Sequence, residues 1–421
     1  MATRVSVPGG RSRRPATPRP AVAVFETEAP SSLIFLQALG SRGVPIHVYG
    51  PGRFPPGRLS PHCVMAARCP DPRRFDEFQT WLSERLQRRE LARVAPTSDL
   101  IAYHCAALRD AFPPEVRDTI PGLDEIEDIL IKSRFNARCE ALGIPVPRTW
   151  YPESPAEAAA LASELPYPVM IKPRSHLGVG MNYRGAVVHD AASFLAAFGP
   201  RPAAPGQEPL LDRYPELRWP MVQEFLPGAR GVHSLCGMRD HRAGIVADAA
   251  VCKTDQWPPG VGIATRFVTT DDPDTITAGR RVIDALLVHG LFCIELLVDG
   301  DRRLPIDLNP RAYLALSLDI ARGHDLPDLW YRSTLGEPLT VQPPPVHSVE
   351  WRRQPLFHLS HWARVLGGPG RRRKLRRYRA LLGAPAVGGT EGSPLSVRLA
   401  CELRLLRHPR SLVRPYWREP E

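Results

Sequence analysis

The chain has 421 residues, of which 43% are hydrophobic and 24% are charged, so it is long enough for two or three packed domains. No stretch approaches the roughly 20 consecutive apolar residues of a membrane-spanning helix. The first residues carry arginines and prolines without the apolar segment of an export signal. The eight cysteines are scattered, without a CxxC pair or zinc-type spacing. These features predict a soluble cytoplasmic protein with buried thiols.

The net charge of +11 is concentrated at the end of the chain. Between Glu350 and Glu421 there are 16 basic and 5 acidic residues, and this difference equals the whole net charge. Residues 1–20 add five arginines and no acid, so residues 21–349 are mildly acidic. A domain that follows a nucleic-acid backbone needs positive charge on its own surface, and the main body of this chain does not show that pattern.

Lysine is rare in this chain. Only four of the 55 basic residues are lysines, namely Lys132, Lys172, Lys253 and Lys374. A lysine kept in an arginine-rich chain suggests a site that needs a compact ammonium on a flexible stem rather than a planar fork. For any single lysine, chance survival on the surface is about as good an explanation. Three of the four nevertheless lie in the central region.

The start of the chain predicts a disordered leader and then a parallel sheet. Residues 1–20 are rich in Arg, Pro and Gly and lack apolar periodicity. The strand, helix, strand order that follows is typical of a parallel sheet, and we place this first domain at residues 21–125. Its predicted elements are strands at 21–25 and 45–49, helices near 31–39 and at 75–89, and a strand-to-loop transition at 93–99.

A second region, residues 126–345, mixes helical and strand patterns. Asp299-Gly300 between two apolar runs is a strong hairpin signal. The Pro-rich stretch 338–345 closes the region, and residues 346–421 are expected to form a basic helical extension. The predicted elements are helices at 128–143, 154–165 and 274–289, and strands at 168–172, 219–226, 291–298 and 303–308.

The hairpin carries the most informative polar residues. Glu295 and Asp307 lie on its two strands, so the turn brings them face to face, and Asn309 follows close behind. Oxygen ligands without His or Cys suit a hard cation, which favours Mg²⁺, or Mn²⁺ in its place. Acids on an ordinary surface hairpin are common, but Glu295 interrupts an apolar strand, where an unpaired carboxylate is costly. Arg311 follows, and a guanidinium there suits a carboxylate or phosphate.

These residues resemble the ATP-grasp superfamily over about residues 128–325. The most specific part is Glu295 with Asp307-Leu-Asn-Pro-Arg311. In that superfamily one lysine precedes a small lid domain and another lies on a lid strand, and both reach ATP phosphates. Lys132 and Lys172 stand at the matching positions. The resemblance also implies that Arg311 acts in catalysis by orienting the reacting group.

Other segments extend the resemblance. Residues 221–228 are similar to the hinge strand that runs along adenine, which implies that Gln223, Glu224, Phe225 and Leu226 contact the base. The glycine turn with Gly178 and Gly180 resembles the loop that folds over the phosphates, although a plain hairpin turn is an equally good reading of those glycines alone. Residues 253–262 resemble a loop of carboxylate-amine ligases, which implies that Lys253 or Arg266 meets the γ-phosphate or the substrate.

The resemblance implies an α/β fold. A parallel-sheet domain is followed by a two-part α+β ATP-grasp module with its lid at about residues 145–226. The implied activity is a carbon–nitrogen ligase that uses ATP and Mg²⁺ to activate a carboxylate as an acylphosphate and joins it to an amine, with amino-acid-like substrates favoured. One departure is that Ala229-Arg230-Gly231 follows the hinge, where the family commonly has an acid for the ribose.

Two other functions stay open at this point. A nucleotide-binding scaffold without turnover is suggested by the arginine at position 230. A basic surface for anionic lipid, nucleic acid or an acidic partner is suggested by residues 371–379 and by leucines at helical spacing near position 400. A tail helix that packs its leucines on the main body and exposes its arginines is the simpler reading of the same residues.

Overall fold

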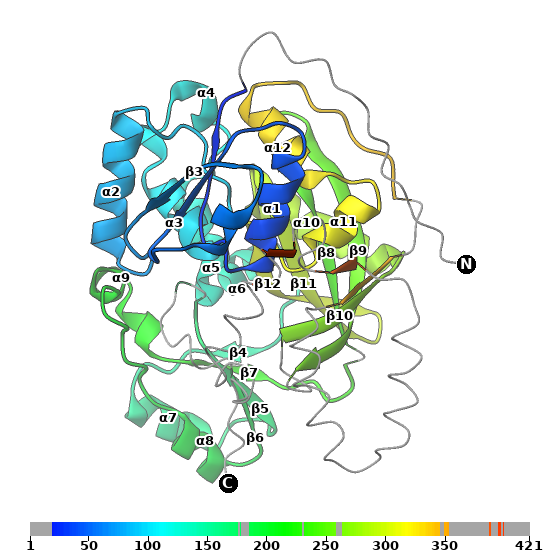
Figure 1. The fold of residues 1–421 in the computed structure, drawn as a ribbon. Helices are drawn as coiled ribbons and strands as arrows, with labels where there is room; N and C mark the ends of the chain where they lie inside the picture. Colours follow the sequence, from blue (N-terminus) through cyan, green and yellow to red (C-terminus); the bar gives the residue numbers. More distant parts are fainter. Residues whose placement is uncertain are drawn as a thin grey trace.

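The structure is a computed structural model that describes residues 19–175, 177, 185–229, 231–257, 263–345 and 349–352, with isolated positions at 387–388, 395–396 and 399. Figure 1 shows three lobes, with a first lobe that carries α1–α4 at the upper left, a small lobe below it and a large sheet on the right. The leader through residue 18, the glycine turn with Gly178 and Gly180, and most of the basic tail lie outside the described residues.

The first lobe is built on the predicted parallel sheet. Its strand order is β1-β2-β3, and both pairings are parallel. Val94 adds a parallel bridge to Ala23 on the other side of β1. Strand β3 was not predicted, although residues 63–67 of the sequence are apolar, and most of its side chains are exposed in the structure. The elements are β1 Val22–Val24, α1 Pro30–Gly40, β2 Ile46–Gly50, η1 Pro56–Leu59, β3 Cys63–Arg68, α2 Phe75–Gln87, α3 Asp99–Ala107, η2 Arg109–Ala111 and α4 Pro114–Arg117.

Two helices stand where one was predicted from residue 128. Helix α5 (Leu123–Leu130) ends before Ile131, and α6 (Lys132–Ala141) begins after it. Ile131 is extended and forms an isolated bridge with Ser175, and the Lys132 N–H donates to the Arg174 carbonyl at 2.8 Å. The chain therefore leaves helical geometry for one residue in order to pair with the segment that follows strand β5.

The small lobe is a four-stranded antiparallel sheet with two helices packed on it. The strand order is β4-β7-β5-β6, and α7 and α8 lie together beside it (Figure 1). Its own apolar cluster includes Val169, Ile171, Phe194 and Val222. The elements are β4 Thr149–Trp150, α7 Pro155–Ala162, β5 Val169–Lys172, β6 Ala186–Val188, α8 Ala191–Ala197, α9 Glu208–Arg213, η3 Pro215–Arg218 and β7 Met221–Glu224.

The large lobe contains a seven-stranded sheet of order β12-β11-β8-β9-β10-β13-β14. The predicted hairpin is present as β11 and β12, and Gly300 in its turn has a φ of +58°, which a glycine adopts without strain. The elements are β8 Gly231–Asp240, β9 Gly244–Trp257, β10 Ile263–Thr269, α10 Pro273–Leu286, β11 Gly290–Asp299, β12 Arg302–Asn309, α11 Leu316–Ala321, α12 Leu326–Thr334, β13 Glu350–Arg352 and β14 Val387–Gly388.

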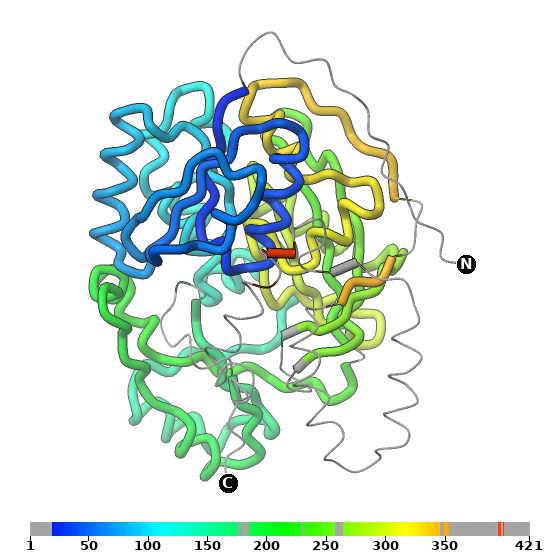
Figure 2. Tube along the Cα trace, in the orientation of Figure 1, coloured from blue at the N-terminus to red at the C-terminus, as the bar shows by residue number. Residues whose placement is uncertain are grey.

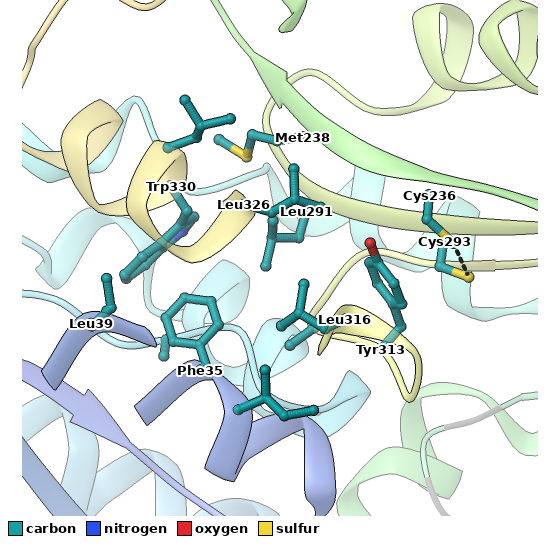
Figure 3. Close-up of a cluster of buried hydrophobic side chains, with 14 of the residues drawn as sticks. Phe35, Leu39, Cys236, Met238, Leu291, Cys293, Tyr313, Leu316, Leu326 and Trp330 are labelled. Carbon is teal, nitrogen blue, oxygen red and sulfur yellow. Dashed lines mark hydrogen bonds between the residues drawn. The ribbon is translucent and has the colours of Figure 1, made fainter. Parts of the chain in front are cut away.

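A shared apolar core joins the first lobe to the large sheet. Phe35 of α1 meets Trp330 of α12 edge to face, with ring centroids 5.2 Å apart. Figure 3 shows Met238 and Leu291 of the sheet in the same cluster. In Figure 2 the blue trace of residues 30–40 accordingly runs beside the yellow trace of the α11–α12 region. Among the described residues, no helix is both long and apolar enough to cross a bilayer.

We expect Phe35→Ala to lower the free energy of unfolding by ~3–5 kcal/mol, because it opens a cavity between α1 and α12. Urea unfolding of the full chain measures the change. Phe54→Ala is the matched control, since Phe54 is 68% exposed and its loss should change stability little. Equal effects of the two substitutions would contradict the packing of Phe35 against Trp330.

Candidate functional site

The hairpin places its polar residues on one face of the large sheet. Glu295 lies directly opposite Asp307, and Asn309 lies opposite Cys293. Residues two apart on a strand point to the same side, so Asp307 and Asn309 share the face that Glu295 occupies. The structure thus brings together the three residues that the sequence marks as candidate metal ligands. Their role as ligands stays a prediction.

Two lysines from other elements pair with the hairpin carboxylates. Lys132, the first residue of α6, places Nζ 2.7 Å from Asp307 Oδ1. Lys253 of β9 places Nζ 3.1 Å from Glu295 Oε2. All four side chains are no more than one quarter exposed. Each carboxylate therefore has a cationic partner in a site with little solvent screening.

The third lysine enters from the small lobe. Lys172, at the end of β5, donates from Nζ to Gln223 Oε1 at 2.8 Å, and Gln223 in turn donates to Thr149 at 3.2 Å. Burial and the positive charge of Lys132 lower the pKa of Lys172 to about 8, while Asp307 and Glu295 act in the opposite direction. Three lysines and two carboxylates thus form one electrostatic unit, which we call the lysine–carboxylate cluster.

Arg311 is held by the first lobe. Its Nε donates to Asp99 Oδ1 at 2.8 Å and its Nη2 to Asp99 Oδ2 at 3.1 Å. The same Nη2 donates to Asn309 Oδ1 at 2.7 Å. Asp99 begins α3, so this bidentate ion pair links the first lobe to the end of the β11–β12 hairpin. The sequence predicted a guanidinium beside the hairpin, but not that a carboxylate of the first lobe would orient it.

The remaining predicted residues have different surroundings. Arg266 pairs with Glu350 at 2.7 Å and lies 3.8 Å from Asp255, so its ion pairs join β10 to β13 and β9 rather than to the hairpin. Glu224 Oε1 accepts from the Arg148 N–H at 2.8 Å. Phe225 and Leu226 follow β7 and are half-buried. Gly178, Gly180 and Arg230 lie outside the described residues.

Glu26 is a candidate residue that the sequence did not reveal. It follows β1 and has a φ of +49°, a left-handed conformation that non-glycine residues rarely adopt. Its Oε2 is buried without a hydrogen-bond partner. Burial raises its pKa, Ser98 hydrogen-bonds to it, and Asp99 and Arg311 are close enough to act on its charge. Its position at the carboxyl end of a parallel strand was the available signal.

Comparisons with known proteins place this architecture. No protein-family model matches the chain. The chain is 27% identical over 314 residues to the carbamoyl phosphate synthase large chain of Deinococcus radiodurans. The matched region covers 69% of this chain and 29% of the relative. An N5-carboxyaminoimidazole ribonucleotide synthetase in its ADP complex superimposes with a TM-score of 0.60 at 13% identity, over 92% of this chain and 97% of that one. The chain has the ATP-grasp fold.

A second structural neighbour with the ATP-grasp fold is the L-amino acid ligase of Bacillus licheniformis. Its TM-score is 0.53 at 14% identity, over 79% of this chain and 80% of that one. The predicted α/β class and the ATP-grasp resemblance are therefore confirmed. The chain spans less than a third of the carbamoyl phosphate synthase chain that it matches, and the solved neighbours act on different substrates.

We expect Asp99 and Arg311 to be energetically coupled. In a double-mutant cycle of Asp99→Ala and Arg311→Ala, the double variant should lose less stability than the sum of the single losses, by ~0.5–3 kcal/mol, because each single change leaves a partly buried charge without its partner. Urea unfolding of the four proteins measures this coupling. The exposed pair Arg74–Glu77 is the control and should show coupling near zero. Additive losses at Asp99 and Arg311 would argue against the link.

Proposed function

We propose that this protein is an ATP- and Mg²⁺-dependent ligase that activates a substrate carboxylate as an acylphosphate and joins it to an amine. The observation that carries the proposal is the lysine–carboxylate cluster. Lys132, Lys172 and Lys253 come from three separate elements of a chain with only four lysines, and all three meet around Glu295 and Asp307.

The charges of the cluster are complementary to a metal–triphosphate complex. Such a complex carries a divalent cation and several anionic oxygens together, so it can bind the carboxylates and the lysines at the same time. The ion pairs Lys132–Asp307 and Lys253–Glu295 keep each charge compensated in the free protein. Binding would exchange these partners rather than create new buried charges, which lowers the desolvation cost of occupying the site.

The donor set fits magnesium. The side chains that could bind a metal, those of Glu295, Asp307 and Asn309, would do so through oxygen atoms. Mg²⁺ prefers a few carboxylate or amide oxygens, with phosphate oxygens completing its coordination shell. When bound there, the metal would supply charge neutralisation at the phosphates. The Asn309 Oδ1 accepts from Arg311, which fixes the orientation of the amide.

The proposed reaction has two steps. An oxygen of the substrate carboxylate attacks the γ-phosphorus of ATP, and ADP leaves with the electrons of the broken P–O bond. A neutral amine then attacks the acyl carbon, the C–N bond forms and inorganic phosphate leaves, while the amine proton passes to solvent or a basic group. The ammonium groups of Lys132, Lys172 and Lys253 stabilise charge on the transferred phosphoryl group. Arg311, fixed by Asp99, orients the activated carboxylate.

The surroundings of the cluster suggest where the other parts of the substrates bind. The strand end at Gln223 to Leu226 lies next to Lys172, so the base would lie along this segment while the phosphates reach the lysines. Glu26 and Asp99 lie on the first-lobe side of Arg311. The buried Glu26 Oε2 has no hydrogen-bond partner and could accept from an amino group, which supports amino-acid-like substrates.

We expect Lys172→Ala and Glu295→Gln each to reduce substrate-dependent ADP release at least ~100-fold, because each removes a charge that meets the phosphates or the metal. The assay is ADP release over a panel of carboxylate and amine pairs. Lys374→Ala and Glu164→Gln are matched controls, since Lys374 belongs to the basic tail and Glu164 is exposed, and both should retain activity.

Full activity in either site variant would exclude this assignment. A wild-type protein that ATP protects against melting, but that releases no ADP with any pair in the panel, would instead indicate a nucleotide-binding scaffold. Circular dichroism of each variant establishes that a loss of activity is not a loss of folding.

The affinity for ATP should fall at alkaline pH. The pKa of Lys172 is about 8, so the side chain is an ammonium at pH 7 and becomes neutral above pH 8. Phosphate favours the ammonium, so the dissociation constant should rise by up to about tenfold per pH unit above pH 8. Titrations with ATP across this range measure the effect. Lys172→Arg stays charged, so its profile should be flatter, and parallel profiles would show that Lys172 is not the titrating group.

A further inference from the structure

A cluster of two histidines and an aspartate lies at the far end of β8 from the hairpin. Asp240 ends β8, His241 follows it in the turn to β9, and His289 precedes β11. Strand β8 pairs with Glu295 through Ser234, six residues before Asp240. At roughly 3.3 Å per residue this separation is about 20 Å, so the cluster is distinct from the proposed nucleotide site.

The three side chains converge on one point. His241 Nδ1 and His289 Nδ1 are 3.3 Å apart, and Asp240 Oδ2 lies 3.9 Å from the first and 3.8 Å from the second. The side chains of Asp240 and His289 are only 1% exposed, whereas that of His241 is 23% exposed. The point equidistant from three atoms with these separations lies about 2.1 Å from each, which is the length of a Zn–N or Zn–O bond.

The hydrogen bonds of His289 direct one nitrogen toward this point. Ser333 of α12 uses its hydroxyl hydrogen to donate to the Trp330 carbonyl at 2.6 Å. Its oxygen therefore accepts from His289 Nε2 at 3.2 Å, which places the ring proton on Nε2 and the lone pair on Nδ1. A metal-binding histidine usually donates the N–H of its other ring nitrogen to such an acceptor, which fixes the orientation of the imidazole.

Asp240 has one oxygen that the protein does not satisfy. Its Oδ1 accepts from the backbone N–H groups of Arg242 and Ala243, both at 3.0 Å. Its Oδ2 is buried without a hydrogen-bond partner, and it is the oxygen that faces both imidazoles. A buried carboxylate oxygen without a partner is costly, and a cation at the common point would supply the missing interaction.

Other groups near the cluster do not provide that interaction. The backbone N–H of His241 donates to His289 Nδ1 at 3.2 Å. This long hydrogen bond competes for the lone pair of His289 Nδ1 but leaves Asp240 Oδ2 unpaired. Arg242 Nε lies 3.7 Å from Asp240, but this ion pair is with Oδ1 and not with Oδ2, and the guanidinium hydrogen bonds of the neighbouring arginines go to backbone carbonyls. Arg239 donates to the Val288 carbonyl at 2.9 Å, and Arg242 donates to the Gly336 and Glu337 carbonyls.

We infer that Asp240, His241 and His289 form a binding site for a divalent transition metal, with Zn²⁺ as the best match to two imidazoles and one carboxylate. The partial exposure of His241 leaves room for water as a fourth ligand. The site would tie the β8–β9 turn to the start of β11 and, through Ser333, to α12. Its effect would be on the stability of the large sheet, independent of the ligase activity.

The test uses the full chain, which is first freed of metal by dialysis against a chelator. It is then dialysed against excess Mg²⁺ in order to saturate the magnesium site proposed at the hairpin. We expect wild-type protein to bind one Zn²⁺ per chain by elemental analysis and to melt at a higher temperature with Zn²⁺ than without it. His241→Asn should lower Zn²⁺ affinity at least tenfold and abolish the rise in melting temperature. His241 is partly exposed, so this variant should fold, and Asp240→Asn provides a second test.

Two controls separate this site from other zinc-binding groups. His62→Asn removes a partly exposed histidine of the first lobe and should leave one Zn²⁺ bound. Glu295→Gln removes a candidate magnesium ligand and should also leave Zn²⁺ binding unchanged. Equal Zn²⁺ affinity in wild type, His241→Asn and Asp240→Asn would overturn the inference, as would the absence of Zn²⁺-dependent stabilisation in wild type. Either result would leave the proposed ligase function standing.

Discussion

The compensation of charge between three lysines and two carboxylates is the constraint on which the site depends. Lys132, Lys172 and Lys253 would repel one another if they met without acids between them, and Glu295 would be costly on an apolar strand without a cation. Together they form a cluster whose charges cancel in part while the groups remain close. The cluster can therefore be partly buried, and in the proposed function it would exchange its internal partners for a nucleotide and a metal.

This cluster lies where the three lobes meet. The small lobe contributes Lys172, the large sheet contributes Lys253 and the hairpin, and α6 contributes Lys132 at its first residue. The first lobe contributes Asp99, which orients Arg311. Apolar packing of α1 on α12 holds the first lobe against the large sheet. The hydrogen bonds between Asp99 and Arg311 thus depend on this apolar packing, because the packing fixes the distance between the two lobes.

The far end of the large sheet shows a different use of polar groups. Asp240 and His289 are almost completely buried, yet they are about 20 Å from the lysine–carboxylate cluster along β8. Burying such groups costs free energy, so they require partners of their own. Backbone N–H groups satisfy Asp240 Oδ1 and Ser333 pairs with His289, so the inferred metal would supply the one partner that Asp240 Oδ2 lacks. It would act on the stability of the sheet rather than on the reaction.

The sequence by itself determined the parallel pairing of the first sheet and the β11–β12 hairpin that carries Glu295, Asp307 and Asn309, because these follow from short-range periodicity and turn residues. It missed β3, although residues 63–67 are apolar, and it missed the break at Ile131, which forms a bridge with Ser175. Only the tertiary structure decided the partners. Lys132 and Asp307 are 175 positions apart, and Asp99 and Arg311 are 212 apart. Such pairings arise from the packing of whole lobes, which no local pattern of residues encodes.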